Sequence, residues 1–229
     1  MGVVMVKSED AAAAAMADGQ PLALHAGIYD LLRQRMIDGE IRPGADLSTR
    51  GLASEMGVSQ MPVRDALSRL AAVGAIAIRS KRRIEVPAMT AARFADLLDC
   101  RLLLEPAAAE MACPHIGPDL LRDLRDIDAA LDRAMAGGDV IGYMKANAAF
   151  HFGIYRANKR PTLNRSIEAL WLQFGPYMRV VYDGYGTAGL IDQHRIALEA
   201  IAAGDAGALR AAIAADIADG MGLVGLSGL

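Results

Sequence analysis

The side chains of Gln60, Met61 and Arg64 combine types and spacing that suit the recognition of nucleic-acid bases. They fall in a short predicted helix and point away from its apolar positions, so they would face outward. Glutamine and arginine can read the donor and acceptor pattern of base edges, and a helix fits into the major groove of DNA. The alternative is a helical hairpin whose charged face is simply solvated.

A second cationic feature follows at Ser80-Lys81-Arg82-Arg83, between two β-like stretches at 75–79 and 84–87. This spacing predicts a β-hairpin with a basic tip. Lysine and arginine at such a tip would lie near phosphates, where they add affinity that does not depend on base sequence. The hairpin would act as a wing beside the outward-facing helix.

Three predicted helices position these side chains. The first covers 24–38, where apolar residues recur at helical spacing. The second covers 49–56 and is capped by Ser48, whose side-chain oxygen can accept a hydrogen bond from a free amide of the first turn. After a glycine turn, Ser59 caps the third helix, which ends at Gly74. Two short helices joined by a tight turn are typical of a helix-turn-helix.

Every long segment beyond Thr90 is predicted to be helical. Proline and glycine breaks divide it into helices at 91–113, 117–136, 139–158, 161–183, 189–203 and 206–222. Consecutive helices with short connections predict an antiparallel bundle of six or seven helices. The expected fold is mainly α, with a flexible tail at 1–21, a winged helix-turn-helix domain of three helices and a two-stranded wing at 22–88, and a helical domain at 91–229.

Charge is distributed unevenly along the chain, whose net charge is −3. Residues 22–88 carry a net charge of +3, whereas residues 91–229 carry −4. A basic segment joined to an acidic one indicates that the first meets a polyanion and the second has another task. A secretory signal and an apolar run long enough to span a membrane are both lacking, so we expect a cytoplasmic protein.

The N-terminal motifs resemble the winged-helix domain of the GntR family of bacterial transcription regulators. The residues that carry the resemblance are, in order, Ile41-Arg42-Pro43-Gly44, Leu47-Ser48, Leu52-Ala53, Gly57-Val58-Ser59, Pro62-Val63-Arg64-Asp65-Ala66-Leu67, Arg69-Leu70 and Gly74. The resemblance implies that one set of residues lies at the DNA surface: Arg50, Ser59, Gln60, Met61, Pro62 and Arg64. It also implies that wing residues, here Lys81, Arg82 and Arg83, reach the minor groove.

This chain departs from the family pattern in two places. Gln60 stands where the family usually has arginine, and glutamine pairs naturally with adenine whereas arginine favours guanine. The wing tip carries three cations where the family usually has a glycine-containing turn. We therefore expect a different base preference at one operator position and stronger contact with phosphates.

The helical segment resembles the FadR-type effector domain of the same family. The residues that carry this looser resemblance are Asp99-Cys100-Arg101-Leu102-Leu103-Leu104-Glu105-Pro106, Phe150-His151, Asn158, His194-Arg195-Ile196 and Ala200-Ile201-Ala202-Ala203-Gly204-Asp205. The resemblance implies a bundle that senses a small carboxylate metabolite and often forms a homodimer.

Many members of this group hold a divalent metal through one Asp or Asn and three His. Matched residue by residue, these positions are Asn147, His151, His194 and Asp216, so that an aspartate replaces one family histidine. Asn147 and His151, at i and i+4, share one helix face. Imidazole with oxygen ligands suits zinc, nickel or manganese. The alternative for each residue alone is an ordinary structural role.

Arg101 is the candidate for binding the carboxylate of the effector, because its guanidinium matches that group in a bidentate manner. The alternative is an ion pair with Glu105 at i+4, which stabilises an exposed helix by only about 0.2–0.5 kcal/mol.

Three functions can be compared at this point. The first is a metabolite-responsive transcription regulator that binds double-stranded DNA at a palindromic operator as a dimer. The second is a metal-dependent enzyme built on the helical bundle, but the sequence lacks the paired Glu-x-x-His, His-Glu-x-x-His and phosphate-loop motifs of such enzymes. The third is an architectural DNA-binding protein without a ligand. We expect a regulator and not an enzyme.

Overall fold

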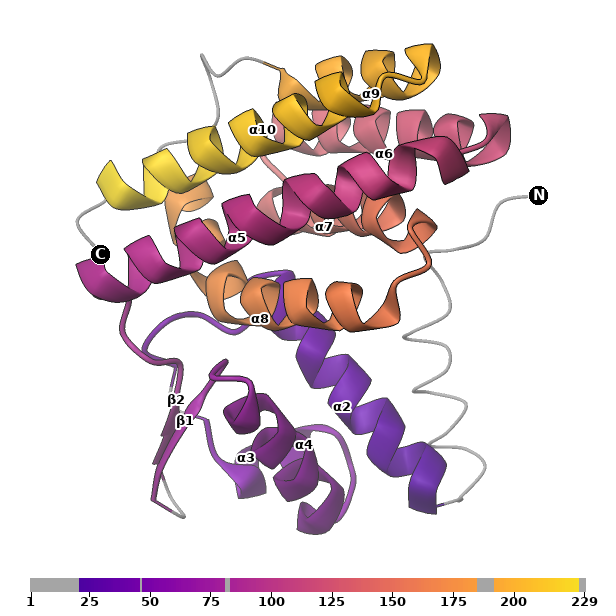
Figure 1. Ribbon diagram of the computed structural model, residues 1–229. Coiled ribbons are helices and arrows are strands. Elements are labelled where there is room, and N and C mark those ends of the chain that lie inside the picture. The colour runs from indigo at the N-terminus through magenta and orange to yellow at the C-terminus, as the bar shows by residue number, and fades with distance from the viewer. Residues whose placement is uncertain (1–20, 46, 81–82, 185–191, 227–229) are drawn as a thin grey trace.

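The computed structural model describes residues 21–45, 47–80, 83–184 and 192–226. Figure 1 shows a small N-terminal domain below a larger bundle of helices. Of the predicted tail at 1–21, only Pro21 lies within the described residues, and it begins the first described helix. The mainly α fold expected from the sequence is confirmed.

The N-terminal domain has a helix-turn-helix followed by a hairpin, with the elements α2 (Pro21–Ile37), α3 (Thr49–Glu55), α4 (Gln60–Ala72), β1 (Ala77–Ser80) and β2 (Arg83–Glu85). Ser48 caps α3 as predicted, since its Oγ accepts a hydrogen bond from the amide of Gly51 at 3.0 Å. Ser59 holds the N-cap position of α4, but its side chain makes no capping hydrogen bond. Gly57 turns the chain between the helices with a φ of 66°, a conformation that favours glycine.

The apolar face predicted for α4 is buried against α2. Val63, Leu67 and Leu70 are at most 2% exposed, and Leu32 and Met36 of α2 are fully buried in the same core. Burial of each such large apolar side chain stabilises the fold by about 1.5–3 kcal/mol. The opposite face of α4 is thereby left toward solvent.

The predicted hairpin is present, with β1 and β2 paired antiparallel. β1 begins at Ala77, after the predicted start, because the amide of Ala75 still bonds to the carbonyl of Leu70 in α4, at 3.1 Å. Leu47 adds a bridge to this small sheet, its amide donating to the carbonyl of Ile84 at 3.1 Å. The wing is therefore joined to the segment that precedes α3.

The second domain is an antiparallel helical bundle, as predicted. Its elements are α5 (Ala91–Ala112), the short 3-10 helix η1 (Cys113–His115), α6 (Pro118–Ala136), α7 (Val140–Ala157), α8 (Pro161–Gly184), α9 (Gln193–Ala203) and α10 (Ala206–Leu226). Figure 1 shows α5 and α10 lying side by side, and α8 is the bundle helix that faces the N-terminal domain. None of the described helices has the length and hydropathy needed to span a bilayer.

Contact between the two domains depends on close approach of α8 to α2. A Cβ atom placed on Gly175 would lie 2.6 Å from the carbonyl oxygen of Met36, so only glycine fits there. Beside this point, Arg33 Nη1 lies 3.0 Å from Glu168 Oε2. Tyr177 donates a hydrogen bond to the carbonyl oxygen of Pro87 at the base of the wing. Helix α8 thus contacts the N-terminal domain at two places, at its first described helix, α2, and at Pro87, just after its last strand.

We expect Gly175→Ala to destabilise the protein by about 1–3 kcal/mol, because the added methyl group must push α8 away from α2. Gly222→Ala is the matched control: it lies in helix α10 with no atom near its Cβ position, and it should stabilise the helix by up to about 1 kcal/mol. Chemical denaturation measures both changes. Equal stability of the two variants would show that the approach of the helices is not tight.

Candidate functional site

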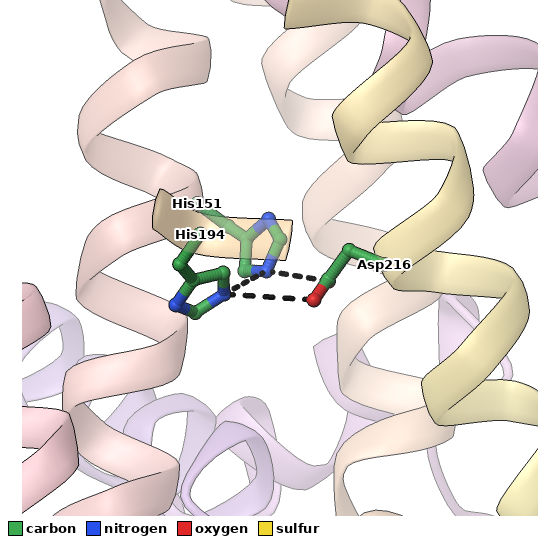
Figure 2. A group of neighbouring side chains, drawn as sticks. All are labelled: His151, His194 and Asp216. Atoms are coloured by element: carbon green, nitrogen blue, oxygen red, sulfur yellow. Dashed lines mark hydrogen bonds and ion pairs between the residues drawn. The ribbon is translucent and has the colours of Figure 1, made fainter. Parts of the chain in front are cut away.

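Three side chains from α7, α9 and α10 meet inside the bundle and form what we call the histidine cluster: His151, His194 and Asp216. Figure 2 shows both imidazole rings turned toward the carboxylate. His151 Nε2 lies 3.1 Å from Asp216 Oδ2, His194 Nε2 lies 3.7 Å from Asp216 Oδ1, and the two Nε2 atoms are 3.4 Å apart. Both histidines are buried, at 1% and 6% exposed. The structure therefore brings together three of the four residues matched to the family's metal site.

The outer nitrogen of each ring has its own partner, which determines the tautomer. His194 Nδ1 lies 3.2 Å from Asp128 Oδ1, a carboxylate that can only accept a hydrogen bond. His151 Nδ1 lies 3.0 Å from the hydroxyl of Tyr155, which donates its single proton to Glu105 at 2.9 Å. Both Nδ1 atoms must therefore carry the proton. When the rings are neutral, both Nε2 lone pairs face the cluster.

The charges around the histidine cluster favour a cation at its centre. Burial alone would lower the pKa of His194, but the hydrogen bond with Asp128 and the charge of Asp216 outweigh it and raise that pKa above its usual value. Burial alone would raise the pKa of Asp216, but the hydrogen bond from His151 and the charges of both histidines, which are present when the rings are protonated, hold it below its usual value. The carboxylate is thus kept ionised beside two ring nitrogens.

These residues fit a divalent metal. Bonds of roughly 2.0–2.1 Å in a tetrahedral site place neighbouring ligand atoms about 3.3–3.4 Å apart, and the observed separations of 3.1, 3.4 and 3.7 Å lie around that value. Asn147, one turn before His151, is 5% exposed and borders the same cavity. Among the described residues its amide has no hydrogen-bond partner, so it is free to supply an oxygen ligand.

Arg101 makes the ion pair that was the alternative to effector binding. Its Nε lies 2.6 Å from Glu105 Oε1 and its Nη2 lies 3.3 Å from Glu105 Oε2. The pair is buried, with Arg101 3% and Glu105 0% exposed, so the small value for an exposed helix pair does not apply. Trp171 Nε1 also donates to Glu105, at 3.0 Å. Arg101 still borders the cavity, so pairing does not remove it from the site.

A cavity of about 230 Å³ lies against the histidine cluster, and its wall includes Arg101, Asp128, Asp132, Asn147, Phe174, Met178 and Asp219. Arg101 is the only arginine or lysine among the described lining residues. Asp128 and Tyr155 were not predicted from the sequence, because their roles depend on contacts between different helices, and Glu105 was predicted only as a partner of Arg101. Only the i, i+4 spacing of Glu105 from Arg101 offered a local signal.

Most of the residues expected at the DNA surface are exposed. Exposed side chains are those of Arg50, Ser59, Gln60, Met61, Arg64 and Arg83. Pro62 is buried, which corrects the expectation that it contacts DNA: it packs in the first turn of α4 and positions its neighbours. Arg83 pairs with Glu85, Nε to Oε2 at 3.1 Å. The wing residues Lys81 and Arg82 lie outside the described residues.

Each of these two sites lies in a part of the chain that matches a known domain family. The model of the bacterial regulatory proteins of the gntR family matches residues 24–86, and the model of the FCD domain matches residues 96–219. The chain belongs to the GntR family. It is a transcriptional regulator with a C-terminal FCD domain, and the alternative of a metal-dependent enzyme is not supported, because the matching families and relatives are regulators.

Individual relatives of this GntR-family regulator match most of its length. The HTH-type transcriptional regulator McbR of Escherichia coli (strain K12) is 30% identical over 177 residues, which cover 76% of this chain and 80% of the relative. The solved structure of E. coli McbR/YncC has a TM-score of 0.84 at 27% identity and covers 90% of this chain and 99% of that one. A GntR protein from Rhodococcus sp. RHA1 shares the fold, with a TM-score of 0.72 at 23% identity and the same coverage.

We expect protein purified without a histidine tag and supplied with zinc to retain close to one metal ion per chain, and His151→Ala to lose it, because a central nitrogen ligand is removed. His115→Ala is the control, since His115 is exposed in η1. Elemental analysis after gel filtration measures the metal, and circular dichroism checks the fold. Equal metal content in the two variants would contradict the assignment.

We also expect Glu105→Gln to destabilise the protein by about 3–5 kcal/mol, because it leaves the buried charge of Arg101 without its partner. Glu110→Gln is the matched control: Glu110 pairs with Arg210 at 2.6 Å, but both side chains are about half exposed, and loss of such a pair costs at most about 1 kcal/mol. Urea denaturation measures both. A similar loss of unfolding free energy in the two variants would show that breaking the buried ion pair costs no more than breaking the exposed one.

Proposed function

We propose that this regulator binds a palindromic operator as a homodimer and is switched by a small carboxylate metabolite that binds beside a metal in the bundle cavity. The observation that carries the proposal is the meeting of the histidine cluster and Arg101 at one cavity, on a bundle that is packed against a helix-turn-helix domain. The regulator would act on bacterial DNA, and so in the cytoplasm.

The exposed face of α4 supports the DNA-binding part. Gln60 and Arg64 lie one helical turn apart and are both exposed, so they can reach neighbouring base edges from one helix in the major groove. Arg50 and Arg83 are exposed on α3 and the wing, where they can contact phosphates. Two such helices related by a two-fold axis would match a palindrome, which is the reason for proposing a homodimer.

The metal would be held by His151, His194 and Asp216, with Asn147 as a fourth ligand. When bound, the metal would supply a Lewis-acidic centre that can accept a carboxylate oxygen of the effector as an added ligand. Arg101 borders the cavity and can hold the other end of the effector while Glu105 keeps its guanidinium in place. The volume of about 230 Å³ suits a small metabolite rather than a drug-sized ligand, which needs roughly 300–1,000 Å³.

Helix α8 offers a direct route from the cavity to the DNA-binding domain. Phe174 and Met178 border the cavity, whereas Gly175 and Tyr177 on the same helix contact α2 and the base of the wing. Because Gly175 leaves no space against α2, a shift of α8 on effector binding must move α2 as well. The effector could thereby change the spacing of the two recognition helices in a dimer.

We expect Arg64→Ala to weaken binding to the operator by roughly 5- to 150-fold, the loss of about 1–3 kcal/mol that accompanies removal of one good base contact. The control is Arg125→Ala, which removes an exposed arginine of α6 in the bundle. The probe is a duplex selected from a random-sequence library by the wild-type protein, and fluorescence anisotropy at fixed salt measures affinity. Wild-type affinity in Arg64→Ala would exclude this face of α4 from the interface.

A further inference from the structure

The wall of the bundle cavity is strongly acidic. We call this set of side chains the acidic wall, and its members are Asp128, Asp132, Asp192, Asp216 and Asp219. The positive charge of Arg101 is already matched by Glu105, in a buried pair at 2.6 Å. Residues 185–191, which lie outside the described part of the chain, contain no charged side chain that could offset the wall.

The acidic wall has a simple origin in helix geometry. Asp128 and Asp132 are four residues apart on α6, and Asp216 and Asp219 are three apart on α10, so each pair lies on one helix face. Asp192 caps the N-terminus of α9 between them, where its side chain accepts a hydrogen bond from the amide of Arg195. Aspartates from three elements therefore face one small space.

The inner and outer members of the acidic wall differ in their partners. Asp128 and Asp216 are engaged by the two histidines of the cluster. Farther out, Asp219 accepts a hydrogen bond only from the neutral amide of Gln193, at 3.3 Å, and Asp132 has no ion-pair partner among the described residues. Burial and the neighbouring charges of Asp128 and Asp192 raise the pKa of Asp132, and they outweigh the opposing charges of His194 and Arg133.

A second observation indicates that a polar ligand belongs in this cavity. Asn147 borders it from α7, is only 5% exposed, and has no hydrogen-bond partner among the described residues. A buried amide is normally hydrogen-bonded, because an unsatisfied polar group in the interior is costly. At the metal-binding end, the amide nitrogen of Asn147 stays available to a ligand when its oxygen binds the metal. On the other side, Asp192 pairs with Arg195 at 3.8 Å, whereas Asp132 and Asp219 have no cationic partner among the described residues.

We propose that the effector carries a protonated nitrogen in addition to its carboxylate, as amino acids and other amino-carboxylic acids do. Its ammonium group lies between Asp132 and Asp219, and its carboxylate lies toward Arg101 and the histidine cluster. A simple carboxylic acid would bring negative charge into an already negative cavity, whereas a zwitterion satisfies both ends. The assignment rests on the proposed effector-binding function and specifies the chemical class of the effector.

The test compares acids that differ only in an amino group, using zinc-loaded full-length protein and isothermal titration calorimetry. Suitable pairs are propionate and β-alanine, butyrate and γ-aminobutyrate, and glutarate and glutamate. In at least one pair we expect the amino compound to bind at least about tenfold more tightly, the gain expected from a charge-assisted hydrogen bond. Asp132→Asn and Asp219→Asn should each reduce this preference. Asp126→Asn, an exposed aspartate of α6 that does not border the cavity, should leave it unchanged.

Two results would overturn the assignment. The first is equal or tighter binding of the acid without the amino group in every pair, which includes the case in which no amino compound binds. The second is an undiminished preference in both Asp132→Asn and Asp219→Asn. Failure of the proposed function has a separate signature: a compound that binds in the cavity but leaves the affinity for the selected operator duplex unchanged.

Discussion

A single buried carboxylate, that of Glu105, is the constraint on which the interior of the bundle depends. It accepts hydrogen bonds from Arg101 on its own helix, from Tyr155 on α7 and from Trp171 on α8. A fully buried charge is tolerated only when it is paired and hydrogen-bonded, and here all these donors converge on it. The ring faces of Trp171 and Phe174 lie 5.0 and 4.8 Å from the guanidinium and shield it from solvent.

The orientation of the histidine cluster follows from the same carboxylate. Because Tyr155 donates its proton to Glu105, its oxygen must accept from His151 Nδ1, and the Nε2 lone pair of His151 then turns toward Asp216. Asp128 has the equivalent effect on His194. The outer partners of both rings therefore prepare the cluster for a cation before any ligand is present.

Helix α8 links the interior of the bundle to the DNA-binding domain, because residues along it contact both. Trp171 contacts Glu105, Phe174 and Met178 border the cavity, and Gly175 and Tyr177 contact the N-terminal domain, all within two turns of one helix. One helix therefore touches both regions, which is the contact that the proposed switching requires. Charge is divided in the same way, with a basic N-terminal segment and an acidic cavity in the bundle.

Features set by neighbouring residues could be predicted from the sequence. Helical spacing, glycine and proline breaks and the cap at Ser48 predicted the helices, the hairpin and their order, because these depend on interactions within a few residues. The resemblance to a known family supplied the candidate metal ligands, which periodicity alone could not have selected. Pro62 was misplaced because the motif places it beside exposed residues, whereas its side chain packs inward.

Contacts between distant segments were decided only by the tertiary structure. His151, His194 and Asp216 come from three helices, and their separation of a few ångströms depends on how those helices pack. The i, i+4 spacing of Arg101 and Glu105 is the same for an exposed pair and a buried one. Burial therefore determined how much the loss of one partner destabilises the protein. The acidity of the cavity likewise arose from packing α6, α9 and α10 together, because aspartates that look like surface residues in each helix face a common space once the helices are assembled.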